Sequence, residues 1–139
     1  MRQAADIIQF QTRGRGMFDI TRTVADWVDR QAMTTGLLSC LCRHTSAGLQ
    51  IQENASPDVR ADLEDFLAKI APESGSRYRH FDEGVDDMPA HLRTVLTGVT
   101  LSIPLIEGKL ALGTWQGIYL YEHRRQPHAR QVALHVAGE

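Results

Sequence analysis

Hydrophobic and polar positions alternate along much of this chain, which is the pattern of half-buried β-strands. The alternation is cleanest over residues 99–105, and the Glu107-Gly108 dipeptide that follows is typical of a hairpin turn. Residues 37–43 are almost continuously apolar, so we expect this strand to be buried on both faces. Further strands are predicted over residues 5–12, 49–52, 110–112, 115–122 and 131–136.

Apolar residues at helical spacing predict three helices. The longest covers about residues 57–70, with Ser56 as its N-cap and Pro57 at its first position. Its expected apolar stripe consists of Val59, Leu63, Phe66, Leu67 and Ile70. Another helix is predicted after Thr21, with Thr21 as its cap, and a short one after Pro89. The short helix is expected to bury Leu92, Val95 and Leu96.

The order of these elements predicts an α+β fold. Strands and helices do not alternate as repeated βαβ units, so a mostly antiparallel sheet packed with two or three helices is expected. The 139 residues fit one domain, residues 1–139, and neither a repeat nor a linker divides them.

Charge and hydropathy exclude two classes of partner. Lys and Arg total 15 and Asp and Glu total 17, a net charge of −2 that lacks the basic excess of a nucleic-acid binder. Apolar runs stay well short of the roughly 20 residues that cross a bilayer, and the N-terminus lacks the apolar stretch of a signal peptide. We therefore expect a cytoplasmic protein that binds neither nucleic acid nor membrane.

Two cysteines lie one residue apart in the apolar strand over residues 37–43. Cys40 and Cys42 share a face if the segment is extended, but their spacing is not that of a zinc site and no second pair exists. We expect two small buried thiols.

The first candidate site residues follow that strand. His44 opens the segment His44-Thr45-Ser46-Ala47-Gly48, whose hydroxyls and backbone N–H groups could contact an anion. The alternative is that the segment only caps the next turn.

A polar loop over residues 71–89 is the second candidate. His80 and His91 flank an acidic set formed by Asp82, Glu83, Asp86 and Asp87. Imidazole and carboxylate groups are ligands of Zn²⁺, Mn²⁺ and Mg²⁺. Asp87 precedes His91 by four residues, so the two share a face if the helix begins early. The alternative is a solvated acidic loop in which Asp87 caps the helix.

The third candidate surrounds the strand over residues 115–122. Gly113 and Gly117 flank its beginning, which indicates close approach by a ligand or another chain. Glu122 lies in an apolar row and must be paired or liganded if buried. The following His123-Arg124-Arg125 offers donors to phosphate, or else lies in water. His128 and His135 have no motif around them.

Several of these segments occur together, in order, over residues 5–139. They are His44-Thr45-Ser46-Ala47, Glu53-Asn54, Asp58-Val59-Arg60, Tyr78 to His80, Glu83-Gly84, Asp86 to Pro89 with His91, and Gly113 to Gly117 with Glu122-His123-Arg124. The chain thereby resembles the YjbQ-type family of secondary thiamine-phosphate synthases. The resemblance implies a homotrimer with clefts near subunit boundaries, and condensation of hydroxymethylpyrimidine diphosphate with thiazole phosphate.

Donor chemistry within the family's motifs gives each residue an expected role. His44, His80 and His91 are expected to bind a divalent metal ion (zinc, magnesium or manganese), with Glu83 and Asp87 as acid–base groups or supports of the ligands. The expected contacts to a phosphorylated metabolite are Thr45, Ser46, Asn54, Thr114 and Arg124.

Two other functions use the same residues. A metal-dependent hydrolase of a small phosphorylated metabolite would need the histidines and carboxylates. A non-catalytic module that binds an anion would need the hydroxyls and the arginine but no metal. The synthase activity could also be secondary to another physiological role.

Overall fold

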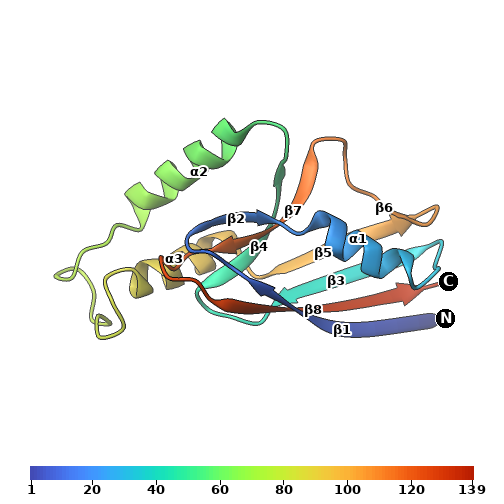
Figure 1. Ribbon diagram of the computed structural model, residues 1–139, viewed down its shortest axis with the longest axis horizontal. Helices are drawn as coiled ribbons and strands as arrows, with labels where there is room; N and C mark the ends of the chain where they lie inside the picture. The colour runs from blue at the N-terminus through green and yellow to red at the C-terminus, as the bar shows by residue number, and fades with distance from the viewer.

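Eight strands form two antiparallel sheets in the computed structural model, which describes all 139 residues (Figure 1). The larger sheet has the order β1-β8-β3-β5-β6 and the smaller has the order β2-β7-β4. The strands are β1 (Arg2–Gln11), β2 (Gly16–Asp19), β3 (Gly36–Cys42), β4 (Ala47–Glu53), β5 (Thr100–Ile106), β6 (Lys109–Leu110), β7 (Gln116–Glu122) and β8 (Ala129–Gly138). The helices are α1 (Thr21–Asp29), α2 (Pro57–Ile70) and α3 (Asp87–Thr97). The α+β prediction is confirmed. None of the helices has the length and apolar character that crossing a membrane requires.

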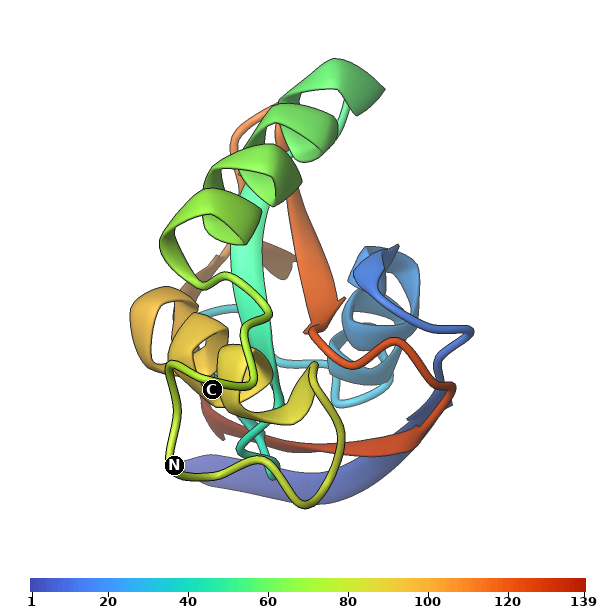
Figure 2. The ribbon, with the colours of Figure 1, turned by 90° about the vertical axis from the view of Figure 1, so that its left-hand side faces the viewer.

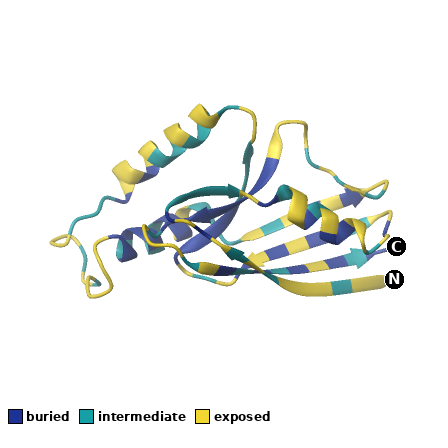
Figure 3. Ribbon diagram, viewed as in Figure 1, coloured by how far each residue is buried: buried dark blue, intermediate teal, exposed yellow.

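The hydrophobic core lies between the two sheets. Figure 2 shows the strands of the smaller sheet crossing those of the larger one, with α2 above the smaller sheet. Side chains from both sheets and from α1 form one buried cluster, which includes Trp27, Leu38, Leu49, Ile103 and Leu120. The alternation predicted for residues 99–105 is confirmed, because Ile103 and Leu105 are buried and the residues between and beside them on β5 are exposed. Buried and exposed positions alternate in the same way along β3 (Figure 3).

Short-range sequence signals in the larger sheet are also confirmed. Glu107 and Gly108 join β5 to β6 with φ angles of 49° and 77°, the positive values that a tight hairpin turn needs. Cys40 and Cys42 both lie on the face of β3 that is turned toward the hydrophobic core, and both are free, buried thiols.

The prediction that β3 is buried on both faces is wrong for the single chain. Leu37 and Leu41 are 45% and 42% exposed, and they lie on the outer face of the larger sheet. Periodicity could not show this, because an apolar run is consistent with burial on both faces or with one apolar face left uncovered.

The apolar stripe of α2 is mostly not part of the core. Leu67 is buried, whereas Phe66 is 57% exposed and borders an apolar groove between α2 and the smaller sheet. A polar network fixes the helix instead. Glu64 accepts bonds of 2.7 and 2.8 Å from Arg93 and one of 2.5 Å from Tyr121. The Ser56 side chain makes no capping bond to α2, contrary to expectation.

The third helix begins earlier and buries a different face than predicted. It starts at Asp87, so Pro89 lies in its first turn, and Val95 and Leu96 are exposed. Its buried face is largely polar and includes Arg93. The early start places Asp87 and His91 on one face.

The cap expected for α1 is also wrong. Thr21 is the first helical residue, after Ile20 at the N-cap position. Its hydroxyl donates to Asp19 at 2.6 Å and accepts from the Ile118 N–H at 2.8 Å, so it ties α1 to β7.

Candidate functional site

Three histidine and carboxylate side chains converge where α3 begins. His80, Asp87 and His91 each offer one ligand atom, and these atoms lie within 4.8 Å of one another. The Asp87 Oδ2 atom is 2.6 Å from His80 Nε2 and 3.2 Å from His91 Nε2. Asp87 is buried, and the two imidazoles lie nearer the surface, so solvent and a ligand can reach them. The structure brings His80 and His91 together, whereas His44, expected in the same cluster, is not part of this group.

A backbone hydrogen bond determines which nitrogen of His91 faces Asp87. His91 Nδ1 lies 2.8 Å from the carbonyl oxygen of Thr45, which can only accept, so Nδ1 carries a hydrogen. In the neutral ring, Nε2 then holds a lone pair directed at the Asp87 carboxylate. Two acceptors this close require a cation between them, either a proton or a metal ion. Metal-binding histidines commonly donate their second N–H to a backbone carbonyl in this way.

Carboxylates surround His80 and stabilise its charged form. The hydrogen bond to Asp87, reinforced by Asp82 and Glu83, raises the pKa of His80 above 6.5. His80 Nδ1 lies 3.6 Å from Asp82 Oδ1, and Nε2 lies 3.9 Å from Glu83 Oε2. The site therefore attracts positive charge.

Arg124 holds the acidic end of the loop. It donates from Nε to Asp86 at 3.0 Å, from Nη1 to Asp87 at 2.7 Å and from Nη2 to the Glu83 carbonyl at 2.9 Å. Burial alone would raise the pKa of Asp87, but the bond from His80 and the charges of His91 and Arg124 outweigh it, so the pKa is lowered. Asp87 is thus ionised and ready to bind a cation.

A buried ion pair supports this end of the smaller sheet. Glu122 is fully buried, and Arg130 donates to it from Nε at 2.9 Å and also from Nη2. Thr12 donates to the same carboxylate at 2.7 Å. Although burial opposes its charge, these donors lower the pKa of Glu122. The prediction that a buried Glu122 must be paired is confirmed.

His123 and Arg125 do not form a phosphate site with Arg124. His123 is fully buried, and burial, with nearby Arg93 and Arg15, lowers its pKa to about 3, so it is neutral. The Arg125 guanidinium binds Glu73. The sequence could not show this, because Glu73 lies 52 residues away.

His44 and Thr45, which follow β3, lie beside the cluster without joining it. His44 Nε2 accepts a hydrogen bond from the Gln131 backbone N–H at 2.7 Å, and His44 is not part of the histidine–aspartate group. Thr45 is exposed and reaches His91 through its carbonyl. The Ser46 hydroxyl accepts from Arg130 at 3.0 Å and is buried, so it serves the ion pair below the surface.

The remaining predicted residues divide between the cluster and a distant edge. Glu83 is beside His80. Asn54 and Thr114 lie near the opposite end of β4, whose seven residues span about 23 Å at the usual rise of a strand. One chain therefore does not bring Asn54 and Thr114 to the histidines.

Sequence reasoning missed two residues on β8. Arg130 neutralises Glu122, and Gln131 fixes the ring of His44. A buried Glu122 needs a positively charged partner, so the sequence indicated a buried cation. The residues next to Glu122 in the sequence do not indicate that Arg130 is this partner.

The donor set fits a divalent cation. Two imidazoles and one carboxylate are three protein ligands, the number that leaves positions open for water or substrate in catalytic sites. Structural zinc sites, by contrast, are closed by four protein ligands.

Comparisons with known proteins agree with this fold along its length. The family model described as UPF0047 protein YjbQ-like matches residues 6–139. A UPF0047 protein of Synechocystis is 49% identical, over 99% of this chain and 94% of its own, and the UPF0047 protein YjbQ of Salmonella typhimurium is 41% identical over 95% and 96%.

Solved structures show the same architecture. The crystal structure of a YjbQ/UPF0047-family protein from Clostridium acetobutylicum has a TM-score of 0.83 at 35% identity and covers 94% of this chain and 99% of its own. A protein of Aeropyrum pernix has a TM-score of 0.85 at 29% identity over both full chains. This chain therefore belongs to the YjbQ-like UPF0047 family.

Proposed function

We propose that this protein is a metal-dependent enzyme that acts on a small phosphorylated metabolite. The observation that carries the proposal is the orientation of His91, whose Nδ1–H is held by the Thr45 carbonyl while Nε2 is directed at Asp87. His80, Asp87 and His91 would hold the ion. Bound there, a divalent cation would neutralise phosphate oxygens as negative charge develops on them.

The specific reaction that we propose is thiamine-phosphate synthesis, the activity implied by the family resemblance. The C–O bond between the pyrimidine methylene and pyrophosphate breaks, and its electron pair leaves with the pyrophosphate. The thiazole nitrogen forms the new C–N bond to the methylene carbon. No oxidation occurs, and the bond exchange itself needs no proton transfer.

The residues of the chain then orient the diphosphate and keep the ligands in place. The exposed Thr45 hydroxyl can donate to a phosphate oxygen. Arg124 acts mainly by holding Asp86 and Asp87, since three of its N–H groups are used within the loop. If Arg124 also contacts phosphate, as the sequence predicted, it would donate from the guanidinium N–H groups that the loop does not use.

Hydrolysis of a phosphorylated metabolite is the second candidate, and Glu83 favours it. Its carboxylate is exposed and lies 3.9 Å from His80 Nε2. A carboxylate beside the metal ligands can accept a proton from an attacking water, a step that hydrolysis needs and condensation does not.

Pyrophosphate release separates the two reactions. The wild-type protein, loaded with Mn²⁺ or Zn²⁺, is given hydroxymethylpyrimidine diphosphate with or without thiazole phosphate. A synthase releases pyrophosphate only with both substrates, whereas a hydrolase releases phosphate or pyrophosphate from one. Glu83→Gln should reduce hydrolysis strongly and condensation little. Absence of any metal-dependent turnover would contradict the proposal.

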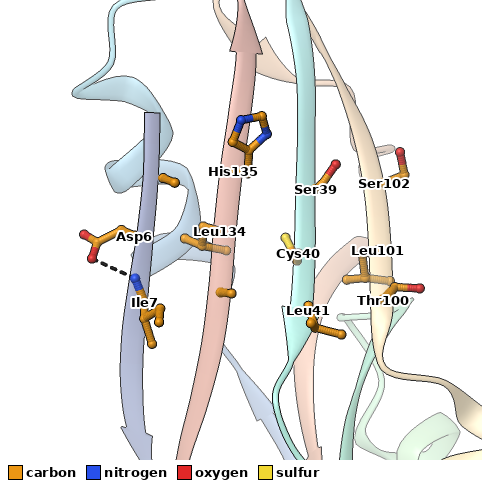
Figure 4. A pocket seen from close by; sticks show the side chains of 12 residues that line it. Asp6, Ile7, Ser39, Cys40, Leu41, Thr100, Leu101, Ser102, Leu134 and His135 are labelled. Atoms are coloured by element: carbon orange, nitrogen blue, oxygen red, sulfur yellow. Dashed lines mark hydrogen bonds between the residues drawn. The ribbon is translucent and has the colours of Figure 1, made fainter. Parts of the chain in front are cut away.

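We also propose that the protein is a homotrimer, in which a second copy covers the outer face of the larger sheet. This face holds a hollow of about 730 Å³ (Figure 4). The exposed apolar side chains Ile7, Leu37 and Leu41 lie on it, beside the small side chains of Ser39 and Ser102. An uncovered apolar face of this kind is typical of an interface.

A further inference from the structure

The structure determines the tautomer of His44. Its Nε2 atom accepts a hydrogen bond from the backbone N–H of Gln131 at 2.7 Å, and a backbone N–H can only donate. The hydrogen of the neutral ring therefore lies on Nδ1. Burial, followed by the charge of Arg130, lowers the pKa of His44, which favours this neutral form.

Neighbouring bonds hold the His44 ring in this orientation. The N–H of Arg43 donates to the Gln131 carbonyl at 3.0 Å, and the Arg43 guanidinium donates to the Gln131 side chain at 2.8 Å. Arg43 is thus bonded to Gln131 through both its backbone and its side chain, which fixes Gln131 beside the His44 ring. The hydrogen bond of the His44 ring within the chain is the one at Nε2, so Nδ1–H is free to donate, and His44 is only partly buried.

His44 and His91 line the same cavity, which has a volume of about 440 Å³. Its walls are formed by His44, Thr45, His91, Thr94, Val95, Gly98 and Val99. The Thr94 hydroxyl donates to the Ala90 carbonyl at 2.9 Å, so it can only accept from a ligand. The volume is in the range of small-molecule sites, and the two valines supply an apolar wall.

We propose that His44 is a substrate-binding residue, whose Nδ1–H donates to an oxyanion of the phosphorylated substrate in this cavity. The proposal rests on the function proposed above, and it replaces the role of metal ligand that the sequence predicted for His44. The fixed donor, the free Thr45 hydroxyl and the apolar wall fit a phosphate group attached to a small organic ring. His91, one of the three proposed metal ligands, lines the same cavity.

Two amide substitutions distinguish the two nitrogens of His44. The side-chain amide of Asn lies about as far from Cα as Nδ1, and that of Gln lies about as far as Nε2. His44→Asn can thus keep a donor toward the cavity, and His44→Gln can keep the acceptor for the Gln131 N–H. The readout is the affinity of the Mn²⁺-loaded protein for inorganic pyrophosphate, measured with the Mn²⁺ affinity.

We expect both variants to keep the Mn²⁺ affinity of the wild type. His44→Gln should weaken pyrophosphate binding by about tenfold or more, as expected for a lost hydrogen bond to a charged group. His44→Asn, which keeps a donor toward the cavity, should retain most of the pyrophosphate affinity of the wild type. Loss of Mn²⁺ in both variants would show that His44 is a metal ligand, and unchanged pyrophosphate binding in His44→Gln would also overturn the proposal.

A second measurement does not depend on the metal. The ¹⁵N chemical shifts of the metal-free wild-type protein should show His44 protonated at Nδ1, and addition of inorganic phosphate should shift that signal. If the wild type binds no metal but His44 still responds to phosphate, the proposed function fails and this inference stands. If His44 is protonated at Nε2, or ignores phosphate, the inference fails.

Discussion

His91 donates from Nδ1 to the carbonyl oxygen of Thr45 across 2.8 Å, and this bond leaves Nε2 directed at Asp87. The contact joins the loop after β3 to the first turns of α3. It thereby directs two residues four apart on a helix toward one point, the arrangement expected of two ligands of the proposed metal ion. A cation between Nε2 and the carboxylate resolves what would otherwise be a contact between two lone pairs.

Metal affinity should fall as the pH is lowered. His80 can bind a metal through Nε2 only after losing its proton, and its pKa is raised above 6.5 by the hydrogen bond to Asp87. As the pH is lowered, the metal affinity should therefore begin to fall while the pH is still above 6.5. Mn²⁺ titrations between pH 8 and 5.5 measure it, and an affinity that is constant over this range would contradict the model of the site.

Arg124→Ala should destabilise the protein by about 2 kcal/mol or more, because it removes the guanidinium that pairs with two largely buried carboxylates, Asp86 and Asp87. Arg125→Ala is the matched control. Its side chain is 58% exposed and pairs with Glu73, so it should cost less than about 1 kcal/mol. Urea unfolding at pH 7 measures both.

The pH dependence of the Arg124 effect gives a further check. The penalty comes from ionised carboxylates, whose pKa values are lowered in the fold. The loss of stability caused by Arg124→Ala should therefore be greatest above the pKa of aspartate in the unfolded chain. It should shrink at lower pH, as Asp86 and Asp87 become protonated. Equal costs for Arg124→Ala and Arg125→Ala at pH 7 would show that Arg124 does not hold the loop.

Stability should decrease in mild acid because of His123. Its pKa is about 3 in the fold, so between pH 6.5 and 5 the unfolded chain binds a proton that the folded chain does not. This contributes up to about 1.4 kcal/mol per pH unit, lost as the pH falls. His123→Phe should remove that slope in unfolding measured across this range. An unchanged slope would show that His123 takes up its proton without unfolding.

The proposed trimer predicts a solution mass of three times 15.6 kDa by light scattering. Leu41→Asp places a charge on the outer face of the larger sheet and should give a monomer. Phe66→Asp is the control, because Phe66 is an exposed apolar residue at the groove between α2 and the smaller sheet, and it should leave the mass unchanged. A wild-type monomer at micromolar concentration would contradict the proposal.

Local patterns predicted the strands and the hairpin well, because alternation and turn residues act over a few positions. The Glu107-Gly108 turn needs only its own two residues to adopt positive φ angles. Cys40 and Cys42 share the buried face because they are two positions apart on a strand.

Polar burial was not predictable in the same way. Arg93 is buried on α3 because Glu64, 29 residues away, accepts its hydrogen bonds. An arginine in a helix normally indicates a solvated face, so the pattern favoured Val95 and Leu96 as the buried residues. Likewise, His80 and His91 were identified from their acidic surroundings, whereas the pairing of His44 with Gln131 spans 87 residues and has no local signal.

The most direct measurement of the central claim is equilibrium dialysis of the wild-type protein against Mn²⁺ or Zn²⁺, together with His91→Ala, Asp87→Asn and the control His135→Ala. His135 bonds Gln3 on the larger sheet, away from the cluster. The wild type and His135→Ala should each bind one ion per chain, and His91→Ala and Asp87→Asn should lose it while remaining folded by circular dichroism. Full metal content in His91→Ala, or none in the wild type, would contradict the metal centre.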